Sequence, residues 1–225
     1  MSADSAEKPI ASKTAVAKRR VPHWRWFVYG LILIGGAMRF WALGTKTLWT
    51  DEIHALYVSQ SLETLTAYCK NGHTPPLRYL MMWALQGLPA TEFAVRIPAA
   101  LFGTATLLLM LWLGEIVRDR RTGIVAAVLL LLSPWHLLHS QDARYYAVML
   151  FLALAALGLA IRIVEDPAPL WRWIVLAILC ALNLYISYTS IFAVGPIVLW
   201  LVWHTGRRWR DRNRDRLPAF LRGMG

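Results

Sequence analysis

Two adjacent carboxylates, Asp51 and Glu52, follow directly behind a long apolar run of the sequence. A carboxylate held beside a membrane can act as a general base, because it can take a proton from a hydroxyl or amine in the transition state. The same stretch also fits an ordinary helix start, since Thr50 can cap a first turn and acidic residues there suit the helix dipole. The sequence at this point therefore allows an active site or a helix start.

Other residues with useful chemistry are predicted to share one membrane face with this acidic pair: His54, His73, Arg96, Asp142 and Arg144. Arginine can neutralise a phosphate group by paired hydrogen bonds. A divalent metal ion is a further possibility, with Glu52, His54 and Asp142 as its candidate ligands, although two histidines in one loop are weak evidence for a metal site. Whether the protein uses a metal stays open from the sequence.

The elements that must position these residues are membrane helices. The chain has 225 residues, of which 57% are hydrophobic and 12 are Trp, and its mean hydropathy is +0.44. Its long apolar blocks lie at 26–43, 97–116, 123–138, 145–163, 171–186 and 190–204, and a shorter one lies at 77–88. Blocks that approach or exceed about 18 residues are typical of membrane spans, whereas one of about 10–14 residues suits a segment along the surface. We therefore predict an all-α, polytopic helical membrane protein with about six transmembrane helices.

The basic residues support this topology. The net charge is +11, and with six spans most Lys and Arg fall on one side, in the N-terminal segment, the Arg118 loop and the C-terminal run. Cytoplasmic loops carry such an excess, so both termini are predicted to be inside. The positive charge is thus attributed to topology and lipid contact, and no nucleic acid is expected as a partner.

This topology divides the chain into a tail, a membrane module and a basic end. We expect a disordered cytoplasmic tail at 1–23, a transmembrane module at 24–205 and a basic cytoplasmic segment at 206–225. One long outer loop, 44–93, is predicted to carry two surface helices, one after Thr50 and one after Pro76. Proline at the start of the second helix supports that assignment.

Four stretches of the sequence resemble the C-type glycosyltransferases, in the branch of protein O-mannosyltransferases and aminoarabinose transferases. They are RFWALGTKTLWTDE (Arg39–Glu52), TPPLRYL (Thr74–Leu80), VRIPAALFG (Val95–Gly103) and RRTGIVAAVLLLLSPWHLLHSQDARYY (Arg120–Tyr146). The stretches keep the family's order and spacing over roughly residues 26–165. Family members are usually longer, with further spans, so the chain resembles the front half of such an enzyme.

The resemblance implies the roles of individual residues. Asp51 would be the catalytic base and Glu52 its neighbour in the active site. The implied substrate-binding residues are Arg39, His73, Arg96, Gln141, Asp142, Arg144 and Tyr145. Two positions depart from the family: Thr74 stands where His often precedes the Pro-Pro pair, and Asp142 stands where Glu is more frequent.

The reaction implied by the resemblance is sugar transfer from a polyprenyl-phosphate donor to a lipid, glycan or protein acceptor. A transferase that faces outward needs a lipid-linked sugar, because nucleotide sugars stay in the cytoplasm. We expect a multi-pass protein of the plasma membrane whose site faces the periplasm or the exterior.

Two other functions remain open. The short chain also fits a non-catalytic membrane module, or one that a partner chain completes. A transporter or lipid flippase is less favoured, because transporters place polar sites near the middle of the membrane, whereas the charges here lie at the ends of the apolar blocks.

Overall fold

The structure is a computed structural model that describes residues 23–72, 74–85, 92–166 and 169–216. Every regular element in these ranges is a helix, and no β-strand occurs there, which confirms the predicted all-α class. The predicted tail as far as residue 22 and the basic segment beyond residue 216 lie outside the described ranges. The helices are α1 (His23–Phe40), α2 (Thr50–Val58), α3 (Leu62–Lys70), α4 (Leu77–Ala84), α5 (Glu92–Val117), α6 (Arg120–Leu131), α7 (Pro134–Ser140), α8 (Tyr146–Glu165), α9 (Leu170–Ile186), the 3-10 turn η1 (Tyr188–Ser190) and α10 (Ile191–Arg216).

Three helical segments are long and apolar enough to cross a membrane: Glu92–Val117, Tyr146–Glu165 and Tyr188–Arg210. The pair α6 and α7 adds a fourth if the two bent helices form one span. Two further apolar helices, Trp26–Phe40 and Leu170–Ile186, are shorter. These helices overlap the six long apolar blocks of the sequence, but the described residues establish three or four candidate spans, and the count of six stays a prediction.

A sharp bend separates α6 from α7, and the sequence analysis did not foresee it. The two helices meet at 70°. Proline disfavours helical backbone at the residue before it, and Ser133 directly precedes Pro134. The Ser133 hydroxyl then accepts a hydrogen bond from the amide of His136, at 3.3 Å, and so caps the new helix. The Ser-Pro pair was the available signal for this break.

Helix α5 lies at the centre of the bundle and packs against α1, α6, α7 and α8. It lies tightly against α6, where a Cβ added to Gly114 would overlap the backbone of Gly123. Small residues at helix crossings let two backbones approach closely in membrane proteins. The two glycines therefore set how tightly α5 and α6 pair.

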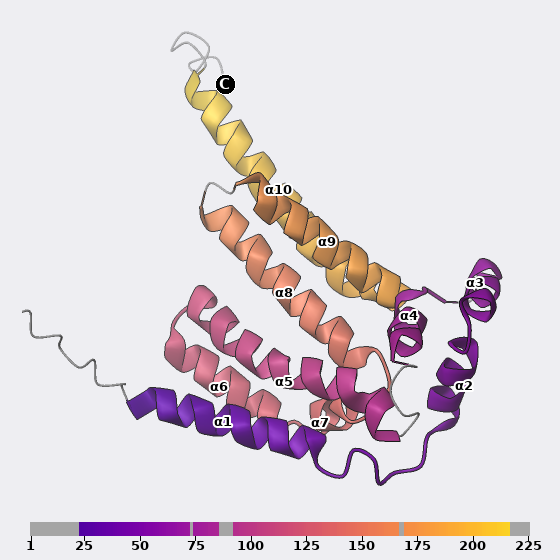
Figure 1. Cartoon of the computed structure of the whole chain (residues 1–225). Coiled ribbons are helices and arrows are strands. Elements are labelled where there is room, and N and C mark those ends of the chain that lie inside the picture. The colour runs from indigo at the N-terminus through magenta and orange to yellow at the C-terminus, as the bar shows by residue number, and fades with distance from the viewer. Residues whose placement is uncertain (1–22, 73, 86–91, 167–168, 217–225) are drawn as a thin grey trace, which may run out of the picture.

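The short helices of the outer loop gather with α7 at one end of the bundle, while the α5–α6 and α8–α9 turns lie at the other (Figure 1). The described part of this loop contains three short helices, α2, α3 and α4, rather than the two predicted. The additional helix, α3, begins where the hydroxyl of Ser61 accepts a hydrogen bond from the amide of Thr64, at 3.1 Å. That these helices lie on a membrane surface stays a prediction.

The start of α2 also differs from the expected capping by Thr50. Thr50 is the first helical residue, and Trp49 occupies the capping position without a side-chain hydrogen bond to the helix. The carboxylate of Glu52 instead accepts the amide hydrogen of Trp49, at 3.0 Å. The helix start therefore depends on Glu52. One residue of the acidic pair thus serves the helix start, which was one of the two possibilities that the sequence allowed, the other being an active site.

Candidate functional site

Glu52 and Arg96 form an ion pair inside the protein. Each side chain is only 1% exposed, and Arg96 Nη2 lies 2.8 Å from Glu52 Oε2. A second bond, from Arg96 Nε to Glu52 Oε1, measures 3.1 Å, so the pairing is bidentate. Because a buried charge without a partner is costly, each residue fixes the position of the other.

Arg96 also holds the chain between α1 and α2 against α5. Its remaining guanidinium hydrogens are donated to the backbone carbonyls of Leu43, Lys46 and Thr47, at 2.9 to 3.1 Å. The sequence analysis expected Arg96 to bind substrate. The structure places its guanidinium inside the protein, where it positions the entry to α2.

The carboxylate of Glu52 connects this entry to a second loop. It accepts the backbone amide of Ala143 at 2.6 Å, in the loop between α7 and α8. Burial tends to raise the pKa of Glu52, but hydrogen bonds from Arg96, Ala143 and Trp49 outweigh it and hold the pKa below the ordinary value. Glu52 is therefore an ionised hub that joins α2, α5 and the loop before α8.

Asp51 lies next to this hub but faces outward. Its side chain is 62% exposed and contacts the guanidinium of Arg144, which is 33% exposed. The bonds of Glu52 to Ala143 and Arg96 fix the two backbone segments that carry this pair. The sequence analysis placed Asp51, Asp142 and Arg144 at one face, and the structure brings Asp51 and Arg144 into direct contact.

Asp142 and Gln141, which precede Arg144 in the same loop, make contacts of their own. Asp142 lies 3.7 Å from the imidazole of His139, and burial together with the negative charge of Glu52 raises its pKa above the ordinary range. Gln141 donates its side-chain amide hydrogens to the carbonyls of Met38 and Trp41, at 2.8 and 3.2 Å. Gln141 therefore fastens the loop to the end of α1.

Arg39 is fully buried, at 0% exposure. Its guanidinium donates to the carbonyl of Gly35 at 2.9 Å and pairs with Nδ1 of His136 at 2.8 Å. The sequence analysis expected Arg39 to bind substrate near the end of the first span. The structure places this cation between α1 and α7, without contact to the surface.

The candidate metal ligands do not converge. His54 bonds with the hydroxyl of Tyr68 at 3.2 Å, and Glu52 is occupied by the contacts given above. Within the described ranges, no group of three His, Cys, Asp or Glu side chains is placed to share a metal ion. His73, the other histidine of this loop, lies outside the described residues.

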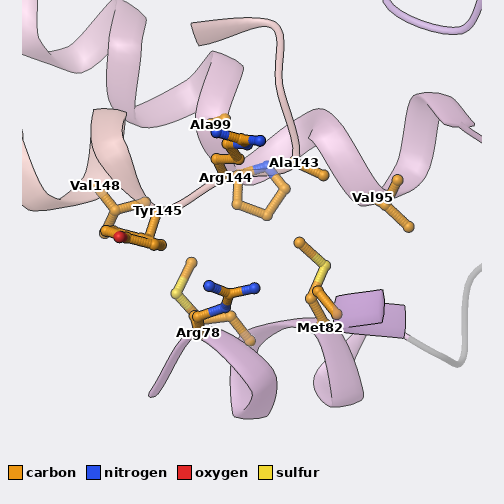
Figure 2. A pocket seen from close by; sticks show the side chains of 11 residues that line it. Arg78, Met82, Val95, Ala99, Ala143, Arg144, Tyr145 and Val148 are labelled. Carbon is orange, nitrogen blue, oxygen red and sulfur yellow. The ribbon is translucent and has the colours of Figure 1, made fainter. Parts of the chain in front are cut away.

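Arg144 borders two pockets. One, between α4, α5 and α8, is lined by Arg78, Arg144 and Tyr145 together with apolar residues (Figure 2). The other, of about 620 Å³, lies beside α7 and α8 and is lined by Arg144, His136, His139 and apolar side chains of α8. Sequence reasoning assigned Tyr145 to the site but missed Arg78, although Arg78 stands within the TPPLRYL stretch.

Comparison with known proteins gives one family. Residues 73–221 match the family model described as dolichyl-phosphate-mannose-protein mannosyltransferase. The matched range includes Arg78, Arg96 and the loop with Arg144, and it begins after Asp51 and Glu52. Neither the curated proteins nor the solved structures gave a match.

Proposed function

The chain belongs to the dolichyl-phosphate-mannose-protein mannosyltransferase family of membrane glycosyltransferases, and we propose that it moves a sugar from a polyprenyl-phosphate donor to an acceptor. The acceptor is a lipid, glycan or protein with a free hydroxyl or amine. The observation that carries the proposal is the contact between Asp51 and Arg144. It puts a carboxylate suited to proton transfer beside a cation suited to a phosphate leaving group.

Asp51 is the general base of the proposed reaction. Its carboxylate takes the proton of the acceptor hydroxyl as the acceptor oxygen bonds to the anomeric carbon of the sugar. General-base catalysis of this kind contributes roughly 10²- to 10⁴-fold to the rate. The exposure of Asp51 supports this role, because the carboxylate remains open to an acceptor.

The bond between the anomeric carbon and the phosphate oxygen breaks in the same step, and the phosphate leaves on its lipid. A phosphate leaving group needs its charge neutralised, which a guanidinium does by charge-assisted hydrogen bonds. Arg144 supplies that charge. A single displacement without a covalent intermediate inverts the anomeric carbon.

Glu52 and Arg96 act as positioning residues in this proposal. Their buried pair and the hydrogen bond that the Ala143 amide donates to Glu52 fix the two segments that present Asp51 and Arg144. Of the two pockets beside Arg144, the one of about 620 Å³ along α7 and α8 has room for a substrate. This arrangement accounts for two adjacent acids with different roles, one exposed and one buried.

The proposed site faces the periplasm or the exterior of a plasma membrane. The basic α5–α6 turn, with Arg118, Arg120 and Arg121, lies at the opposite end of the bundle (Figure 1), and short basic loops favour the cytoplasm. A membrane-impermeant maleimide tests this in intact cells, with cysteine placed at Glu63 or at Arg118 in a background without Cys69 and Cys180. Labelling at Glu63→Cys alone is expected, and labelling at Arg118→Cys alone contradicts the orientation.

Asp51→Asn tests the catalytic assignment. The variant should insert and accumulate normally yet lose sugar transfer from a polyprenyl-phosphate donor, measured with purified protein in lipid discs. Glu63→Gln is the matched control, because it removes an exposed carboxylate of α3 and should keep full transfer. Unchanged transfer by Asp51→Asn contradicts the base assignment, and no transfer by the unsubstituted protein favours a non-catalytic module.

A further inference from the structure

The pocket between α4, α5 and α8 brings two arginines to opposite walls. Figure 2 shows the guanidinium of Arg78, from α4, reaching into the pocket from one side and Arg144 bordering it on the other. The walls between them are mainly apolar and include Met81, Met82 and Val95. None of the described residues that line the pocket is acidic. Two positive charges therefore border one apolar space.

Arg78 has no acidic partner among the described residues. Its guanidinium lies 4.6 Å from the ring centre of Tyr79 and 5.4 Å from that of Tyr145. Aromatic faces attract a guanidinium and orient its plane. They accept none of its N–H hydrogen bonds in the plane, so with respect to the described residues the donor edges stay available to an anion.

Arg144 is held by a partner that it can leave. Its carboxylate partner, Asp51, is largely exposed, and exposed ion pairs are weak, typically worth about 0.2–1 kcal/mol. An anion between two arginines in an apolar pocket gains more, because charge-assisted bonds strengthen where water is excluded. Arg144 can therefore exchange Asp51 for such an anion.

We propose that Arg78 and Arg144 together bind the phosphate of the lipid donor in this pocket, and that Arg144 leaves Asp51 when the phosphate arrives. The proposal rests on the proposed function. Asp51 then lacks its ion-pair partner only while the donor is bound, so both oxygens of its carboxylate are free for the acceptor when the substrate is present. Arg78 is thus a binding residue for the donor phosphate.

The size of the pocket agrees with a closed state before the donor binds. Its volume is about 20 Å³, which is room for about one water molecule. A phosphate enters only when lining side chains move. Movement of Arg144 away from Asp51 and repacking of Met81 and Met82, whose side chains are flexible, supply that space.

The experiment measures binding of a polyprenyl monophosphate, without sugar, to the full chain in discs of zwitterionic lipid. Arg78→Gln should weaken binding at least about tenfold, since it removes a charge-assisted contact, and Arg78→Lys should weaken it less. Arg118→Gln removes an equal charge at the far end of α5 and should bind as the unsubstituted protein does. Equal effects of Arg78→Gln and Arg118→Gln overturn the proposal, provided that thermal melts show both variants folded.

Parallel titrations with inorganic phosphate and with phosphatidylglycerol identify the source of the phosphate. Inorganic phosphate should bind more weakly than the polyprenyl phosphate but with the same dependence on Arg78. Phosphatidylglycerol that competes as well as the polyprenyl phosphate overturns the assignment to the donor.

Asp51→Asn separates the exchange from the proposed function. Releasing Arg144 from its carboxylate should tighten polyprenyl-phosphate binding about two- to fivefold, the range expected when a weak exposed ion pair no longer competes. Unchanged or weaker binding overturns the exchange, whatever happens to transfer. If Asp51→Asn still transfers sugar while Arg78→Gln loses phosphate binding, the base assignment fails and the phosphate site stands.

Discussion

Arg144 contacts Asp51 although the two residues are 93 positions apart in the chain. The contact joins the start of α2 to the loop before α8, and next to it the amide of Ala143 donates a hydrogen bond to Glu52. The two adjacent acids thus have different environments, since Asp51 is exposed and Glu52 is buried. This relationship leads to predictions that separate function from stability.

Arg144→Ala should impair donor binding with little effect on stability. Because its ion pair with Asp51 is partly exposed, its loss should change the free energy of unfolding by no more than about 1 kcal/mol. Binding of a polyprenyl-phosphate sugar in detergent should weaken far more than in Arg121→Ala, which removes the same charge from the α5–α6 turn. Equal losses in the two variants would mean that only general electrostatics is involved.

Glu52→Gln should destabilise the fold strongly. It leaves the guanidinium of Arg96 buried without a counter-charge, and breaking one side of a buried pair costs about 3–5 kcal/mol. Thermal or denaturant unfolding in detergent measures the change. Glu115→Gln is the control, since its pair with Arg120 is about half exposed and should contribute less than about 1 kcal/mol. Similar losses of stability in both variants would argue against a buried ion pair between Glu52 and Arg96.

Acid should destabilise the protein through Glu52. The folded pKa of Glu52 lies below its ordinary value of 4.5, so the stability it contributes is complete above about pH 4.5 and is lost as the pH falls through the folded pKa. The melting temperature of the unsubstituted protein, minus that of Glu52→Gln, should stay constant from about pH 7 to pH 5 and shrink below that. A difference that shrinks already between pH 7 and pH 5 would contradict the depressed pKa.

Asp142 should show the opposite dependence. Burial and the charge of Glu52 raise its pKa above the ordinary value of 3.8, so its ionisation costs stability as the pH rises from about 3.8 through the folded pKa. Asp142→Asn should therefore raise the melting temperature at neutral pH relative to the unsubstituted protein, and the gain should vanish in acid. A gain that grows on acidification would show that the pKa is lowered instead.

The crossing of α5 and α6 should not tolerate a larger residue. A side chain at Gly114 would overlap Gly123, and overpacking of this kind typically costs about 1–3 kcal/mol. Gly114→Ala should lower the melting temperature in detergent. Gly30→Ala in α1 is the matched control, because nothing lies within 4 Å of its added Cβ, and it should be neutral or stabilising.

The sequence by itself determined the helical class and the placement of the main helices. Apolar blocks are local signals, and each becomes a helix because a helix satisfies all backbone hydrogen bonds within one segment, without water. The Pro-Pro pair before α4 likewise indicated the start of a helix from the sequence alone. The expectation that the loops with Asp51 and Arg144 share one face followed from counting spans, and the two residues meet in the structure.

Only the tertiary structure decided which charged side chains are exposed and which are buried. Arg39, Glu52 and Arg96 carry the same charges as exposed residues would, yet all three are buried, with partners up to 97 positions away. Such pairs arise from how the helices cross and how α6 and α7 bend, and a local pattern does not encode a contact between distant segments. For the same reason the sequence analysis did not single out Arg78. Only in the folded structure does α4 lie opposite the loop that carries Arg144.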